Sequence, residues 1–71
     1  MSQGVKIIQY LIDHPEGITP MDAFEKLRIT KLATRISELI RDGYTDIEKI
    51  PESYKTPEGE TIRYMRYRWA A

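Results

Sequence analysis

The segment from Ile29 to Tyr44, ITKLATRISELIRDGY, constrains the fold more than any other part of this chain. Apolar residues recur in it at intervals of three and four, the spacing that places them on one side of an α-helix. They are Leu32, Ile36, Leu39 and Ile40. Gly43 follows them, where a residue without Cβ ends a helix most easily. We therefore predict an amphipathic helix over about residues 31–42, capped at its start by the Thr30 side chain.

A shorter helix is predicted just before this one, over about residues 20–27. Thr19 suits the N-cap, and Pro20 suits the first helical position, where an N–H is not needed. Its apolar side is formed by Ala23, Phe24 and Leu27, with Met21 beside them. Ile29 would fill the angle between the two helices. Two short helices joined by such a turn form a helix-turn-helix, although Arg28 stands where glycine is common.

The N-terminal segment predicts a further helix over about residues 3–13, with Ser2 as its N-cap. Its expected buried stripe consists of Val5, Ile8, Leu11 and Ile12, and Ile7 and Tyr10 widen this stripe. Pro15 and Gly17 then end the helix. Ile18 is expected to add one short strand or β-bridge before the second helix.

After Gly43 the pattern changes from helix to hairpin, with strands over about residues 46–54 and 61–69. Pro51 restricts the first strand to a sheet edge or a bulge. The second strand alternates: Met65, Tyr67 and Trp69 face one way, and Tyr64, Arg66 and Arg68 face the other. We place Tyr67 and Trp69 in the core, against the first and third helices.

Composition narrows the class of protein. A chain of 71 residues allows one domain, residues 1–71, with a small core. It has no cysteine, no apolar run of about 18 residues and no signal-peptide pattern, so a cytoplasmic protein without a membrane segment is expected. The 11 basic and 11 acidic residues cancel, which counts against a strongly electrostatic nucleic-acid binder. Charge is separated locally, however: residues 61–71 hold three arginines and no acid.

Three helices followed by a hairpin with a polar tip resemble the winged helix-turn-helix domain, an α+β fold, over nearly the whole chain. The resemblance rests on Arg35-Ile36-x-x-Leu39-x-x-x-Gly43-Tyr44 followed by the hairpin. The segment from Ile18 to Tyr44 and the terminal RYRW are similar to small helix-turn-helix proteins of bacteriophages and prophages. This resemblance implies a double-stranded DNA-binding protein, a transcriptional regulator or recombination accessory, in a phage or bacterial cytoplasm.

The resemblance also implies which residues contact DNA. The third helix would enter the major groove, and the hairpin would contact phosphate or minor groove as a wing. The candidates are Lys31, Thr34, Arg35, Glu38 and Arg41 on the helix and Lys55 and Arg63 on the hairpin, with Lys49 as a further wing residue. Arg35 is the best of them, because a guanidinium can pair with guanine at two points. Two alternatives stay open: Glu38 pairs with Arg35 on a solvated helix face, and the hairpin makes no contact, since Glu58 and Glu60 lie at its tip.

Winged helices also serve as protein-interaction modules, so the fold alone does not decide function. Neutral net charge favours this alternative, which predicts that Met21, Tyr54 or Tyr64 is exposed. Homodimerisation through the first helix or the C-terminal strand is compatible with either function.

Other chemistries have little support. Arg66 and Arg68 beside Tyr64 could bind single-stranded nucleic acid, but pairing with Glu48 or Glu52 across the hairpin is favoured. His14 is the only histidine, and no serine lies in a nucleophile motif, so neither a metal site, a cofactor nor an enzyme is expected.

Overall fold

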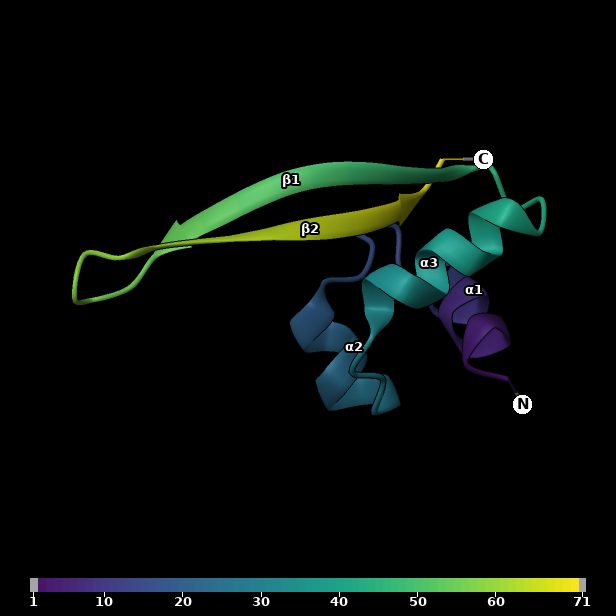
Figure 1. Ribbon diagram of the computed structural model, residues 1–71, viewed down its shortest axis with the longest axis horizontal. Coiled ribbons are helices and arrows are strands. Elements are labelled where there is room, and N and C mark those ends of the chain that lie inside the picture. The colour runs from purple at the N-terminus through teal and green to yellow at the C-terminus, as the bar shows by residue number, and fades with distance from the viewer. Residues whose placement is uncertain (1, 71) are drawn as a thin grey trace.

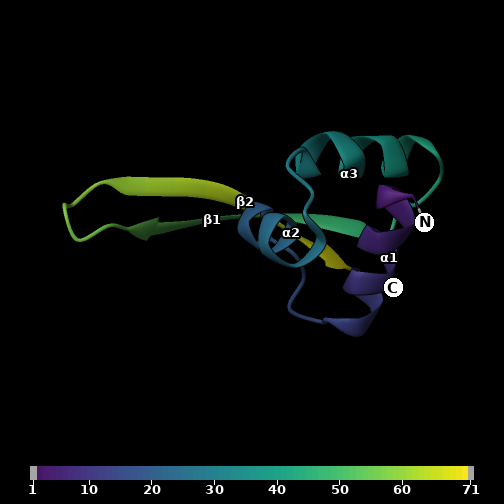
Figure 2. The ribbon, with the colours of Figure 1, turned by 90° about the horizontal axis from the view of Figure 1, so that it is seen from below.

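The computed structural model describes residues 2–70. Three helices are followed by one antiparallel hairpin, which confirms the predicted α+β class (Figure 1). The elements are α1 (Gln3–Asp13), α2 (Pro20–Leu27), α3 (Leu32–Arg41), β1 (Ile47–Lys55) and β2 (Thr61–Trp69). The molecule measures 40 × 22 × 21 Å, because the hairpin projects well beyond the helices (Figures 1 and 2). Within residues 2–70, no helix is long and apolar enough to span a membrane.

The core takes side chains from every element and from the two connections between the helices. Its buried members are Ile7, Leu11, Ile18, Ala23, Ile29, Leu32, Ile36, Leu39, Ile47 and Tyr67. Ile29, 1% exposed, fills the angle between α2 and α3 as predicted. Because the ends of the hairpin near the helices contribute Ile47 and Tyr67, the hairpin is anchored in the same core that holds the helices.

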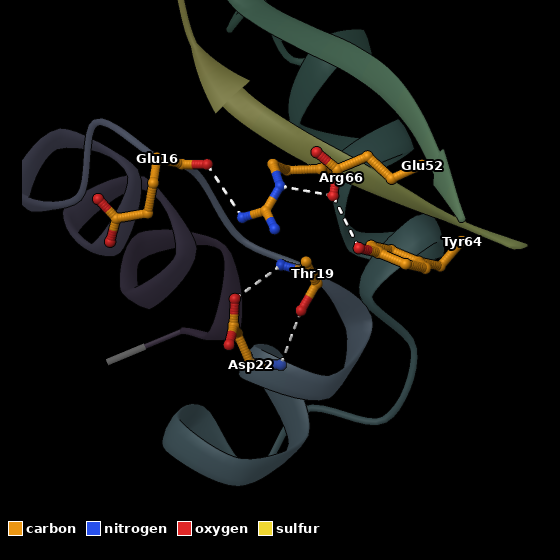
Figure 3. A network of polar contacts seen from close by, with 6 residues as sticks. All are labelled: Glu16, Thr19, Asp22, Glu52, Tyr64 and Arg66. Carbon is orange, nitrogen blue, oxygen red and sulfur yellow. Dashed lines mark hydrogen bonds and ion pairs between the residues drawn. The ribbon is translucent and has the colours of Figure 1, made fainter. Parts of the chain in front are cut away.

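Helix starts follow the predicted caps at α1 and α2. The Ser2 hydroxyl accepts from the Val5 N–H at 3.2 Å. At α2 the Thr19 hydroxyl accepts from the Asp22 N–H, and the Asp22 carboxylate accepts from the Thr19 N–H, which forms a capping box (Figure 3). Pro20 begins the helix directly after this cap.

The predicted cap of α3 at Thr30 is wrong. The helix begins at Leu32, the residue at the cap position is Lys31, and no side chain caps it. The reason lies in the preceding turn, where Arg28 adopts a left-handed conformation (φ 57°) and the Ile29 N–H donates to the Ala23 carbonyl. Burial of Ile29 sets the path of this turn, so packing overrides the local capping preference of threonine.

Two predicted apolar stripes are also corrected. On α1 the buried residues are Ile7 and Leu11, whereas Val5 and Ile12 are 45% and 57% exposed. On α2 only Ala23 is fully buried, and Phe24 is 51% exposed. Both helices carry more apolar residues than one side can bury, and tertiary contacts choose which of them face the core.

The hairpin has a continuous register that pairs Ile47 with Trp69 and Lys55 with Thr61. Its main contacts with the helices are those of β2 with α1 and α2, whereas packing against α1 and α3 was predicted. Tyr67 is buried and Trp69 is partly buried. The expected bridge at Ile18 is confirmed: Ile18 and Tyr67 exchange two backbone hydrogen bonds, at 2.7 and 2.9 Å.

Candidate nucleic-acid interface

Helix α3 presents a polar side to solvent, opposite the buried residues Leu32, Ile36 and Leu39. Thr34 and Arg41 lie two helical turns apart on this side, and both are exposed. Lys31, just before the helix, is exposed as well. Three of the five predicted helix residues are therefore exposed to a partner.

Arg35 is placed differently from the other cations of α3. Its Nε donates to the side-chain oxygen of Gln3 on α1 at 2.7 Å, and its terminal nitrogen donates to Glu38 at 2.8 Å. The side chains of Arg35 and Glu38 are 34% and 41% exposed. The pairing of Glu38 with Arg35, left open by the sequence, is therefore present, and the Arg35 guanidinium lies at the edge of α3 that meets α1.

The hairpin carries its charges on separate faces. Side chains alternate along a strand, so the odd-numbered residues of β1 and β2, which face each other in the register, share one face. This odd face holds Lys49, Lys55 and Arg63 and no carboxylate. Lys55 and Arg63, both predicted wing residues, thus lie on one face with Lys49, and all three are exposed.

The opposite, even-numbered face of the hairpin is neutralised by ion pairs. Arg68 donates to Glu48 at 2.9 Å, and Arg66 donates to Glu52 at 2.9 Å. The predicted cross-strand pairing of both arginines is confirmed, so these arginines already have partners within the protein.

Glu52 is the centre of a small network (Figure 3). It accepts from the Tyr64 hydroxyl at 2.8 Å and from Arg66, which also donates to the Glu16 carbonyl at 3.1 Å. Hydrogen bonds from Tyr64 and then Arg66 lower the pKa of Glu52. The hydrogen bond to Glu52 raises the pKa of the Tyr64 hydroxyl. The network ties β1 and β2 to the loop between α1 and α2.

Some accessible residues give no signal in the sequence. Ala33 and Ser37 lie on the exposed part of α3, but small uncharged side chains carry no charge or periodicity that marks a contact. Arg28 is also exposed, at the start of the turn before α3.

The His14 side chain packs against the end of α1. Its ring stacks on Tyr10 with centroids 3.9 Å apart, and its Nδ1 lies 2.9 Å from the Tyr10 carbonyl oxygen. Within residues 2–70, no group of three or more His, Cys, Asp or Glu side chains is placed to hold a metal ion.

Comparison with known families matches residues 2–70 to the model of the winged helix-turn-helix domain. The chain belongs to this family. No curated protein and no solved structure matches it. Winged helix-turn-helix domains are typically DNA-binding modules without catalytic activity, so membership indicates DNA binding. In this domain, α3 is the second helix of the helix-turn-helix and the β1–β2 hairpin is the wing.

Proposed function

We propose that this protein binds double-stranded DNA sequence-specifically, with α3 in the major groove, as a transcriptional regulator or recombination accessory of the kind that phages and bacteria encode. The observation that carries the proposal is the separation of charge on the wing. Lys49, Lys55 and Arg63 share a face without carboxylates, while Glu48 and Glu52 of β1 are paired on the other face. A protein of zero net charge can therefore still offer a basic surface to phosphate.

On α3, the accessible residues Lys31, Thr34 and Arg41 are the proposed first contacts. Lysine and arginine would bind phosphate or guanine, and the threonine hydroxyl can bond to either a base or a phosphate. Arg35 and Glu38 are proposed to join the interface by exchanging their bond to each other for bonds to bases. Because their ion pair is partly exposed, separating it costs about 1 kcal/mol or less.

On the wing, Lys55 and Arg63 are proposed to contact phosphate and Lys49 to extend the same face. Phosphate contacts fix register and orientation without reading sequence. The acidic tip, with exposed Glu58 and Glu60, would stay clear of the backbone.

A salt titration of duplex binding tests the proposal. Each phosphate contact adds about 0.9 to the slope of log affinity against log salt. Arg63→Gln and Lys55→Gln should each reduce the slope by about one such contact, and Arg41→Ala should weaken binding. Arg68→Gln is the matched control, because it removes one positive charge from the same strand as Arg63 but from the paired face.

Two results would count against the proposal. Absence of duplex binding at low salt would reject DNA binding itself. If Arg68→Gln and Arg63→Gln reduce the salt slope of binding equally, the odd face is not the face of the wing that contacts DNA.

A single module buries roughly 600–1,000 Å² on DNA, which favours binding as a dimer to repeated half-sites. We propose that α1 forms the dimer contact. Val5 and Ile12 lie two turns apart on one side of α1 and are 45% and 57% exposed.

A further inference from the structure

The outer edge of β2 has backbone groups without a partner strand. The Thr56–Glu60 and Asp46–Ala70 pairs are hydrogen-bonded across the hairpin, so hydrogen bonds between β1 and β2 fall at even-numbered residues. Odd-numbered residues of β2 therefore point their N–H and C=O groups outward. Tyr67 uses its groups to pair with Ile18. Within residues 2–70, no bridge extends this pairing to Met65, Arg63 or Thr61.

The outer edge of β1 is protected, in contrast. Pro51 occupies an odd-numbered position opposite Met65, so its missing N–H costs no bond within the hairpin. It removes one outward donor from the middle of β1, a common way of blocking strand addition. The two edges of the wing thus differ: one is interrupted by proline and the other is open.

An apolar groove lies beside the open edge, between the start of α2 and the even face of the hairpin. Its volume is about 310 Å³, and it is lined by Thr19, Pro20, Met21, Asp22, Tyr54, Ile62, Tyr64 and Arg66. Met21 and Tyr54 are 61% and 48% exposed. The volume is at the lower end for ligand sites, which fits aliphatic side chains of a peptide better than a metabolite.

The positive charge of Arg63 indicates whether a strand added at this edge would come from a second copy of this chain or from a different protein. Antiparallel pairing of two β2 edges about a twofold axis centred on the open segment would place Arg63 opposite Arg63, and like charges opposite each other are destabilising. A strand with a carboxylate opposite Arg63 would be favoured instead. The neighbours of that carboxylate would face the groove, because successive side chains alternate.

We propose that the open edge of β2 binds an extended segment of a partner protein as a third strand, with one acidic residue opposite Arg63 and apolar residues on either side of it. The added strand would continue the pairing that Ile18 begins. Backbone hydrogen bonds at Arg63 and Met65 would hold it, and its apolar side chains would fill the groove against Met21 and Tyr64. This strand-addition site is separate from α3 and does not depend on DNA binding, although it shares Arg63 with the proposed phosphate contact of the wing.

The probe is a blocked peptide, Val-Thr-Val-Glu-Val-Thr-Val with a soluble glycine-serine tail, added to the ¹⁵N-labelled full chain. We expect amide shifts to concentrate at Arg63, Met65 and the residues around Met21. Methylating the peptide nitrogens that face β2 should weaken binding about tenfold, since each lost hydrogen bond is worth several-fold. Replacing the central glutamate by lysine should weaken it by about fivefold.

Matched protein variants test which strand edge of the hairpin binds the peptide. Arg63→Pro and Ser53→Pro each remove one outward N–H, at positions directly opposite each other in the hairpin. Arg63→Pro should weaken peptide binding about tenfold and Ser53→Pro should leave it unchanged. Arg63→Gln keeps the backbone N–H but removes the positive charge, so it measures the effect of the charge alone.

Shifts centred on β1 or α3, or equal binding of the methylated peptide, would overturn the proposal. If Arg63→Pro does not fold, the comparison of plain and methylated peptides on the unchanged protein still decides. Failure of peptide binding would leave the DNA proposal untouched, because no DNA is present in the experiment.

Discussion

At the scale of single residues, Gly17 shows how a missing side chain lets the hairpin dock. It has a positive φ of 88°, and a Cβ placed on it would clash with the Tyr67 carbonyl oxygen. That oxygen is the acceptor for the Ile18 N–H. Glycine is therefore needed here for close approach as well as for backbone conformation.

Gly17→Ala is expected to destabilise the protein more than Gly59→Ala. Gly59 has the same φ of 88°, but a Cβ added there would meet nothing within 4 Å, so it is a control for backbone strain alone. The clash at Gly17 should add about 1–3 kcal/mol to the loss of unfolding free energy. Urea denaturation of both variants measures the difference. Equal losses would mean that the loop moves aside without cost.

At the scale of elements, the wing needs support beyond its own backbone, because an isolated two-stranded hairpin is only marginally stable in water. Its base is held by Ile47 and Tyr67 in the core. Farther out, Glu52 joins Tyr64 and Arg66, and Arg66 reaches the Glu16 carbonyl. The ion pairs of the even face thus support the hairpin, whereas Lys49, Lys55 and Arg63 of the odd face take no part in those pairs.

The Glu52 network predicts a pH dependence of stability. The pKa of Glu52 is lowered in the folded protein, so its contribution is fully present above its ordinary pKa of about 4.3 and is lost as pH falls through the folded value. Unfolding free energy measured between neutral and strongly acidic pH should therefore fall less in Glu52→Gln than in wild type. Tyr64→Phe, which removes the largest cause of the shift, should give an intermediate slope. Identical pH profiles in all three proteins would show that the network does not persist in solution.

At the scale of the whole molecule, the placement of charged side chains explains how a protein of zero net charge can belong to a DNA-binding family. Glu48 and Glu52 of the wing are paired on one face, and Lys49, Lys55 and Arg63 lie on the other. Exposed apolar residues also lie in two separate places. Val5 and Ile12 are on one side of α1, and Met21 lines the groove beside the wing. Two separate contact surfaces besides α3 are thus available.

If α1 forms the dimer contact, Ile12→Glu should convert a dimer into a monomer of 8.3 kDa. Burying a new carboxylate at an apolar contact without a partner is costly. Met21→Glu is the control, because Met21 is similarly exposed, at 61% against 57%, but lies on α2. Light scattering coupled to gel filtration gives both masses. A wild-type protein that stays monomeric at concentrations where it binds DNA specifically would contradict the dimer proposal.

Local sequence signals were sufficient for the order of elements and for several of their details. The caps at Ser2 and Thr19, the buried side of α3 and the alternation of β2 all depend on neighbours within a few residues. The Ile18 bridge and the ion pairs of Arg66 and Arg68 were also predictable, because alternation and opposite charge limit the choices.

The candidate DNA-binding residues were predicted by resemblance and charge, but their surroundings were not. The sequence allowed Arg35 to pair with Glu38, three residues along the same helix, but the hydrogen bond to Gln3 could be foreseen only if the packing of α1 on α3 were known. Likewise, the common face of Lys49, Lys55 and Arg63 depends on a register without bulges, despite Pro51 in the middle of β1.

Helix period, capping and strand alternation are properties of neighbouring residues, so the amino-acid sequence was enough to specify a helix-turn-helix followed by a wing. Packing in three dimensions determined which side of α1 is buried, where α3 begins and which cations remain accessible. On a helix such as α1, with apolar residues around more than half of its surface, the partners that pack against it determine how far the buried side extends. The accessible basic face of this protein is therefore a product of packing and register, not of composition.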